Sequence, residues 1–137
     1  MLPDRKPVGS VLVVDDAENI RDLLSLVLLN AGFEIATADT GNRALEMAAA
    51  GCFDVLVVDL GLPDMDGMDL VKKLRKAGIR SRIVVLSGRA DALSPEAFEG
   101  LGVDGVLPKP LELQTFLGEM RRLAAAGLET AQKEVRP

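Results

Sequence analysis

Short apolar runs alternate along the chain with longer stretches in which apolar residues recur at helical spacing. Three runs are continuously apolar and rich in β-branched residues, at positions 11–14, 55–58 and 83–86. Such runs are typical of parallel strands that are buried on both faces of a sheet. Two weaker segments, 33–38 and 105–107, alternate in character or end at a proline, which favours strands at the sheet edges. The pattern therefore predicts five strands with the three apolar runs at the centre.

Helical stripes separate these strands. Apolar residues three and four positions apart give a helix one apolar face, and this spacing occurs in residues 20–31, 44–49, 70–77 and 113–124. Glycine closes each of the first three stripes and is expected to end those helices, while Thr40 is expected to cap the second. The segment 89–102 is the least regular, and Ser94 followed by Pro95 predicts a short helix that begins late.

Alternating strands and helices predict an α/β fold, with a parallel sheet and helices on both faces. With the weakest strands at the edges, the expected arrangement is the flavodoxin-like doubly wound five-stranded sheet, in the order 2-1-3-4-5. Residues 10–126 are expected to form one domain. Residues 1–9 would be an N-terminal extension, and residues 127–137 a polar C-terminal tail or the start of a linker.

Polar residues follow the predicted strands at one end of the sheet. Asp15 and Asp16 follow the first strand, Asp59 ends the third, Ser87 ends the fourth and Lys109 comes after the fifth. Each has an ordinary structural interpretation: Asp16 could cap a helix, Ser87 could belong to a turn and Lys109 could be solvated. In doubly wound sheets, however, ligands bind outside the carboxyl ends of the strands. The joint occurrence of all five therefore predicts a functional site there.

Three neighbouring carboxylates repel one another unless a cation lies between them. The chain of 137 residues contains no His and only one Cys, so the available ligands are oxygens, which favours Mg²⁺, with Mn²⁺ or Ca²⁺ as substitutes. A lysine and a hydroxyl beside the metal suit a phosphoryl group, and Asp59 is placed to act as a nucleophile. The formal charge of −5 argues against direct nucleic-acid binding by this domain.

The chain resembles the receiver domains of response regulators in bacterial two-component signalling. Four motifs carry the resemblance, in order along nearly the whole chain: VLVVDD at 11–16, VVDLGLPDMDG at 57–67, VVLSG at 84–88 and LPKP at 107–110. The resemblance implies a phosphoryl-accepting switch rather than a turnover enzyme. Its partner would be a sensor histidine kinase or a histidine phosphotransfer protein, which would supply the histidine that this chain lacks.

By this resemblance Asp59 accepts the phosphoryl group. Asp16 would bind the metal directly and Asp15 through water, while Asp59 and the backbone carbonyl of Gly61 would complete the protein ligands. Lys109 would pair with the phosphoryl oxygens.

Ser87 would bond a phosphoryl oxygen and move on activation, and the peptide bond before Pro110 would be cis. One position departs from the family pattern: Val106 stands where the family usually has Tyr or Phe, so the usual ring rotation is unavailable. We therefore expect the surface around residues 87–107 to change mainly through the segment after Ser87. Arg89, two residues after Ser87, could reach over the phosphoryl group or could simply be solvated.

Two alternatives remain beside the switch. A phosphorylation-independent pseudo-receiver would share the fold but would normally have lost part of the acidic pocket. A haloacid-dehalogenase-like phosphatase needs a second Asp two positions after the first, where this chain has Gly61 after Asp59 and Ala17 after Asp15. With neither a signal-peptide pattern nor an apolar stretch of about 20 residues, a cytoplasmic location away from membranes is expected, and a phosphorylation-dependent dimer stays open.

Overall fold

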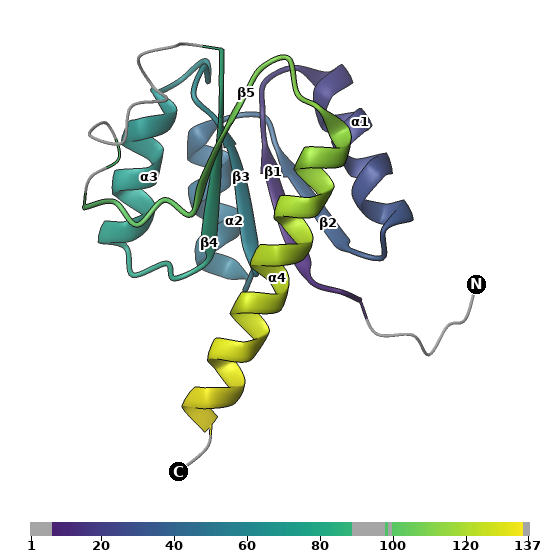
Figure 1. Cartoon of the computed structure of the whole chain (residues 1–137). Helices are drawn as coiled ribbons and strands as arrows, with labels where there is room; N and C mark the ends of the chain where they lie inside the picture. Colours follow the sequence, from purple (N-terminus) through teal and green to yellow (C-terminus); the bar gives the residue numbers. More distant parts are fainter. Residues whose placement is uncertain (1–6, 89–97, 99, 136–137) are drawn as a thin grey trace.

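The computed structural model describes residues 7–88, 98 and 100–135, the last ten of them by backbone alone. Five parallel strands form one sheet in the order β2-β1-β3-β4-β5, which confirms the predicted arrangement (Figure 1). Their bounds are β1 (Ser10–Val14), β2 (Glu34–Ala38), β3 (Val55–Asp59), β4 (Arg82–Ser87) and β5 (Gly105–Pro108).

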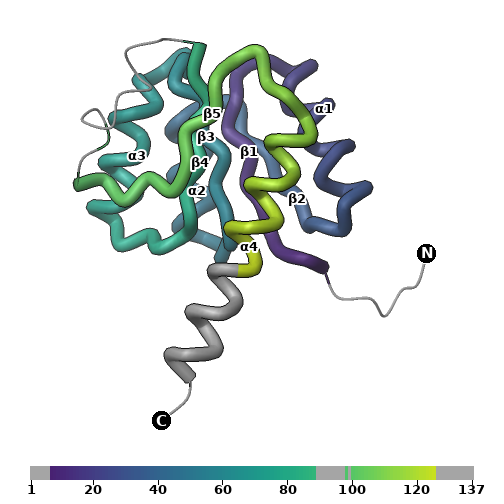
Figure 2. The backbone as a smooth tube through the Cα atoms, in the orientation of Figure 1, coloured from purple at the N-terminus to yellow at the C-terminus, as the bar shows by residue number. Residues whose placement is uncertain are grey.

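Helices cover both faces of this sheet, as predicted. They are α1 (Glu18–Asn30), α2 (Gly41–Ala50), α3 (Gly67–Lys76) and α4 (Leu113–Val135). α1 and α4 lie side by side on one face, and α2 and α3 cover the other (Figures 1 and 2). α4 continues well past the apolar stripe that predicted it and through the boundary expected at residue 126. The short helix expected after Pro95 lies outside the described residues.

The central strands supply side chains to both halves of the core. In β1, Leu12 and Val14 pack with α2 and α3, whereas Val11 and Val13 pack with α1 and α4. All four are fully buried, because alternate side chains of a strand point to opposite faces and here both faces are covered. Residues 55–58 of β3 are equally buried. Continuous apolar runs at the centre of the sheet follow directly from this double burial.

Strand register brings the polar residues after the strands to one edge. Val14 pairs with Val58, so the next residues, Asp15 and Asp59, lie side by side. Asp59 pairs in turn with Leu86, which places Ser87 one residue further along the same edge. We call this group of Asp15, Asp16, Asp59, Ser87 and Lys109 the carboxyl-end site.

The helix ends explain how the chain turns at each edge. Gly32 and Gly78 have φ values of +96° and +84°, a region that other residues rarely adopt, so these glycines end α1 and α3 as predicted. The Thr40 hydroxyl accepts a hydrogen bond from the Arg43 backbone N–H, which confirms the predicted cap. None of the helices in the described part of the chain is both long enough and apolar enough to cross a membrane.

Candidate functional site

Three carboxylates meet at the ends of β1 and β3. One oxygen each from Asp15, Asp16 and Asp59 lies within 4.8 Å of the other two. Asp15 and Asp59 are buried, whereas Asp16 is exposed at the rim. α1 begins after Ala17 without a side-chain cap, so Asp16 does not serve as the helix cap that was its structural alternative. Its carboxylate is therefore left for the site.

The turn after β1 holds Asp15 in place through the backbone. Asp15 Oδ1 accepts a hydrogen bond from the Ala17 N–H at 2.9 Å. The Asp15 N–H donates to the Ala38 carbonyl, and the Arg21 guanidinium donates to the Asp15 carbonyl at 2.8 Å. These bonds fix one carboxylate oxygen in the turn and direct Oδ2 toward Lys109. The same residue thus contributes to local structure and to the site.

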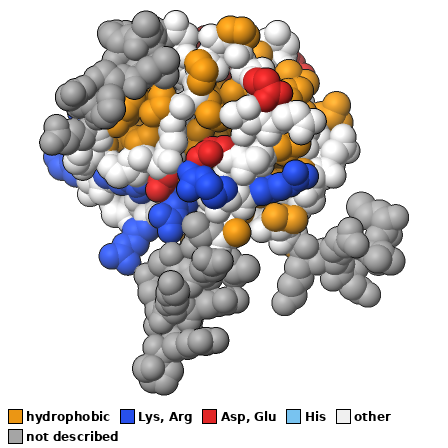
Figure 3. Space-filling model, in the orientation of Figure 1, with side chains coloured by type: hydrophobic (Ala, Val, Ile, Leu, Met, Phe, Trp, Pro, Cys, Tyr) orange, Lys and Arg blue, Asp and Glu red, His pale blue; other side chains and the backbone are white. Residues whose placement is uncertain are grey.

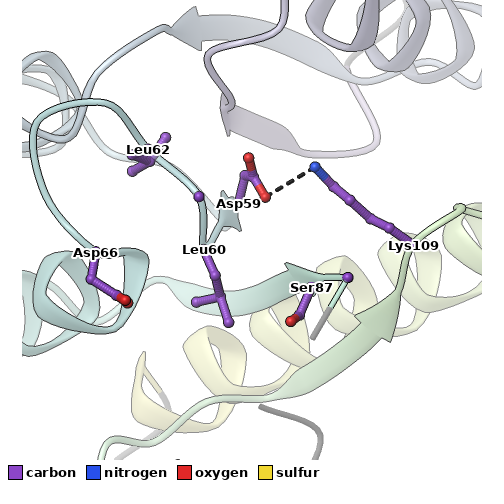
Figure 4. A pocket seen from close by; sticks show the side chains of 8 residues that line it. Asp59, Leu60, Leu62, Asp66, Ser87 and Lys109 are labelled. Carbon is purple, nitrogen blue, oxygen red and sulfur yellow. Dashed lines mark ion pairs between the residues drawn. The ribbon is translucent and has the colours of Figure 1, made fainter. Parts of the chain in front are cut away.

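Lys109 reaches across the site from the segment after β5. Its Nζ lies 3.0 Å from Asp59 Oδ1 (Figure 4). The same Nζ lies 3.4 Å from Asp15 Oδ2. The Lys109 N–H donates to the Ser87 carbonyl at 2.9 Å, and the following peptide bond to Pro110 is cis. Burial alone would lower the pKa of Lys109, but the hydrogen bond to Asp59 and the charge of Asp15 outweigh it and raise the pKa. The ammonium is therefore charged at neutral pH.

Burial also shifts the acidic side of the site. It raises the pKa of Asp15 above the ordinary value, and the nearby charge of Asp59 acts in the same direction. The Ala17 N–H and the Lys109 ammonium act the other way without cancelling it. Among the described residues, Asp15 and Asp59 thus share the Lys109 ammonium, and Asp16 adds a third carboxylate beside them. The three carboxylates fit a hard divalent cation, because all the available ligand atoms are oxygens. Their combined negative charge also exceeds the positive charge of Lys109.

A hollow of about 520 Å³ opens beside Asp59. Gly61, Ser87 and Lys109 line it together with Asp59, and Figure 4 shows Asp59 and Lys109 pointing toward one another while the Ser87 hydroxyl is turned away from them. A side chain at position 61 would place its Cβ 3.9 Å from Asp59 Oδ2, so glycine keeps the space beside the carboxylate open. Leu60, Leu62, Asp66 and Gly88 also line the hollow and were not among the predicted site residues.

The predicted site residues that are described fall into two groups. Asp15, Asp16, Asp59, Ser87, Lys109 and the backbone of Gly61 come together at the carboxyl-end edge. Val106 instead lies half-buried on β5, paired with Val85 and packed against the core under α2 and α3. Arg89 lies outside the described residues.

A second charged group lies at the opposite edge, where the strands begin. We call Arg75, Arg82 and Asp104 the amino-end cluster. The Arg75 guanidinium donates hydrogen bonds of 2.8 to 3.1 Å to the carbonyls of Ile79, Ser81, Leu101 and Gly102. Asp104 lies 3.8 Å from Arg75 and 3.5 Å from Arg82, and also accepts the Ile83 N–H at 2.8 Å. This cluster ties the loops before β4 and β5 to α3.

Comparison with known proteins is consistent with this geometry. The response regulator receiver domain family matches residues 11–121. The chain is 38% identical over 125 residues to the transcriptional regulatory protein KdpE of Mycobacterium tuberculosis, covering 91% of this chain and 54% of that protein. Identity to the response regulator MprA of Mycobacterium ulcerans is 37% over 113 residues, covering 82% and 49%. The chain thus spans about half the length of the curated relatives it matches.

Solved structures of similar proteins share the whole fold. The chemotaxis response regulator CheY4 of Vibrio cholerae superposes with a TM-score of 0.77 at 31% identity, covering 87% of this chain and 99% of that one. The response regulator TrrA of Thermotoga maritima, solved in complex with Mg²⁺ and BeF, gives a TM-score of 0.75 at 28% identity, covering 83% and 97%.

Proposed function

The chain belongs to the response regulator receiver domain family, and from that premise we propose that Asp59 is its phosphoryl acceptor. The donor is a phosphohistidine on a histidine kinase or a histidine phosphotransfer protein. The observation that carries the proposal is the position of Asp59: it is buried, 3.0 Å from the Lys109 ammonium, and faces a hollow of about 520 Å³. A carboxylate without such a hollow would have no room for the incoming group.

The proposed transfer requires little of the protein beyond placement and charge. An Asp59 carboxylate oxygen attacks phosphorus, the bond between phosphorus and the donor imidazole breaks, and the imidazole nitrogen keeps the electron pair. Lys109 balances charge on the phosphoryl oxygens, and the Ser87 hydroxyl donates a hydrogen bond to one of them. The domain speeds only its own phosphorylation and dephosphorylation, so it acts as a switch.

Mg²⁺ is the metal we propose for this site. Asp16 would hold it directly and Asp15 through water, with Asp59 and the Gly61 carbonyl as further ligands; Mn²⁺ or Ca²⁺ would substitute. When bound, the ion supplies positive charge to the oxygens of the transferring group. The cluster of three carboxylates supports this assignment, as does the Mg²⁺ of the similar TrrA structure.

The proposed readout is a change in the surface around residues 87–107. Val106 is stiff at its single side-chain torsion, so little apolar area is redistributed there, and the segment after Ser87 carries the change.

We propose no direct nucleic-acid contact for this domain, given its charge of −5. We also propose a cytoplasmic location, where a kinase has access to ATP. Phosphorylation-dependent dimerisation would be a further consequence of the altered surface.

Acetyl phosphate and beryllofluoride test the acceptor directly. With Mg²⁺ present, intact-mass analysis of the parent chain should show one added phosphoryl group, and NMR should show a beryllofluoride complex with shifts concentrated at 87–107. Asp59→Asn should lose both. Asp69→Asn removes the same charge from an exposed position on α3 and should retain both. A parent chain that takes up neither probe would favour the pseudo-receiver alternative.

A further inference from the structure

The start of α2 has an acceptor for each of its first four backbone N–H groups, residues 41–44. Asp64 takes the first two, with Oδ1 and Oδ2 accepting at 2.8 and 2.9 Å. Thr40 takes the others, through its hydroxyl for the third and its carbonyl for the fourth, each at 3.1 Å. Helix starts usually draw their caps from adjacent residues. Here half of the capping comes from a carboxylate more than 20 positions away in sequence.

Asp64 belongs to the segment 60–66 that joins Asp59 to α3, which we call the acceptor loop. The next residue, Met65, packs so closely on Gly41 that a Cβ there would lie 2.6 Å from the Met65 Cγ and Sδ. The acceptor loop is therefore fastened to the start of α2 by two charge-assisted hydrogen bonds and by direct packing.

The first and last residues of the acceptor loop are held by the sheet and by α3. The Leu60 N–H donates to the Leu86 carbonyl at 3.2 Å, and the Gly67 N–H donates back to the Leu60 carbonyl at 3.0 Å. Gly61 and Asp66 form an antiparallel bridge within the loop. Gly61 thus lies in a short loop that is held by β4, by α3 and by α2, and Asp64 supplies the charged contact to α2.

We propose that Asp64 is a positioning residue for the metal site: by binding the start of α2 it fixes the acceptor loop and so the Gly61 carbonyl that would bind the ion. The inference rests on the proposed function, in which that carbonyl is a ligand. Mg²⁺ demands nearly ideal octahedral geometry, so a ligand on a loop free to shift binds it less well. Groups that orient metal ligands without touching the ion commonly change metal affinity when removed.

The charge of Asp64 suits this task. The two backbone N–H groups lower the pKa of its carboxyl, and the positive end of the α2 dipole favours the same ionised form. The side chain is exposed, and what burial it has acts the other way without cancelling these hydrogen bonds. At neutral pH both oxygens are therefore acceptors.

Thr40 provides a matched control, because it caps the same helix end through hydrogen bonds with residues 43 and 44 of α2 itself. Mg²⁺ affinity would be measured by calorimetric titration of the parent chain, Asp64→Ala, Asp64→Asn and Thr40→Ala, since the chain has no Trp or Tyr to report by fluorescence. Thermal melting of each variant would be recorded alongside. We expect Asp64→Ala to weaken Mg²⁺ binding about tenfold. Asp64→Asn, which keeps one oxygen acceptor, should lose less, and Thr40→Ala should lower the melting temperature while leaving the affinity unchanged.

Backbone NMR without metal supplies a readout that helix stability alone would not move. The Gly61 amide should shift in both Asp64 variants and stay in place in Thr40→Ala. Parent-like Mg²⁺ affinity in Asp64→Ala would overturn the inference, as would an equal loss in Thr40→Ala, while leaving the proposed metal site intact. If Asp64→Ala does not fold, Asp64→Asn decides in the same way. A parent chain that binds no Mg²⁺ would overturn the proposed metal site, and this inference with it.

Discussion

Two charged groups lie at opposite ends of the same sheet, and they differ in how their charges are matched. In the amino-end cluster, four carbonyls surround the Arg75 guanidinium, and Asp104 lies near both arginines. In the carboxyl-end site, two of the three carboxylates pair with the Lys109 ammonium among the residues that the structure describes. In Figure 3, Lys and Arg side chains gather on the lower half of the visible face, the side where the strands begin.

This difference indicates that the amino-end cluster stabilises the fold, whereas the carboxyl-end site is suited to binding a ligand. A buried or half-buried charge stabilises a fold only when fixed partners replace the water it loses. Arg75 has such partners within its own chain, so its charge is matched in the folded protein without a ligand from solution. The three carboxylates of the carboxyl-end site stand against the single Lys109 ammonium among the described residues, and a cation from solution would balance the excess negative charge.

Removing Arg75 should produce the largest effect on stability. Arg75→Ala leaves four carbonyls without their donor and is expected to lower the free energy of unfolding by about 3 kcal/mol. Urea denaturation would measure it. Arg43→Ala breaks only an exposed ion pair with Glu46 and should cost less than about 0.5 kcal/mol. If the two variants are equally stable, or if Arg75→Ala also abolishes Mg²⁺ binding, the division between the two ends is wrong.

Adding Mg²⁺ should stabilise the protein through the carboxyl-end site and not through the amino-end cluster. At a Mg²⁺ concentration about ten times the dissociation constant, binding to the folded state contributes about 1.4 kcal/mol, or roughly 5 °C in melting temperature. Differential scanning calorimetry at constant ionic strength would show it. Asp16→Ala removes one of the three carboxylates and should abolish the rise. A rise of the same size in that variant would place the binding elsewhere.

The smallest effect concerns a carboxylate near the site that does have fixed partners. Hydrogen bonds from residues 41 and 42 lower the pKa of Asp64 in the folded state below its ordinary value of 3.8. Its contribution to stability is therefore fully present above that value and is lost as the pH falls through the folded pKa. The stability difference between the parent and Asp64→Asn, measured by urea denaturation, should shrink between pH 6 and pH 2. A difference that grows toward low pH would contradict the assignment.

The fold was predictable because its signals are local. Double burial requires continuous apolar strands, so residues 11–14, 55–58 and 83–86 identified the centre of the sheet. Gly32, Gly78 and Thr40 marked helix ends for reasons that lie in their own backbone or side chain. The length of α4 was underestimated, because the apolar stripe that predicts a helix ends before the helix itself does.

The site was predictable in part for a similar reason. Strand ends in a parallel sheet share an edge, so the convergence of Asp15, Asp59 and Ser87 followed from topology. The partners of Asp64 and Arg75 did not, because both bind backbone atoms of distant segments, and a sequence gives no sign of which N–H or carbonyl lacks a partner. Such contacts depend on tertiary structure alone.

The burial of residues 11–14 and 55–58 has an evolutionary consequence. Their side chains lie in the core, so these parts of β1 and β3 offer a partner no side-chain surface, and the acidic residues follow at their carboxyl ends. Recognition of the proposed kinase would then be encoded on the outer faces of the helices and in the loops. Those surfaces are free to diverge while the reactive groups stay unchanged. The architecture allows a lineage to exchange signalling partners without redesigning its chemistry.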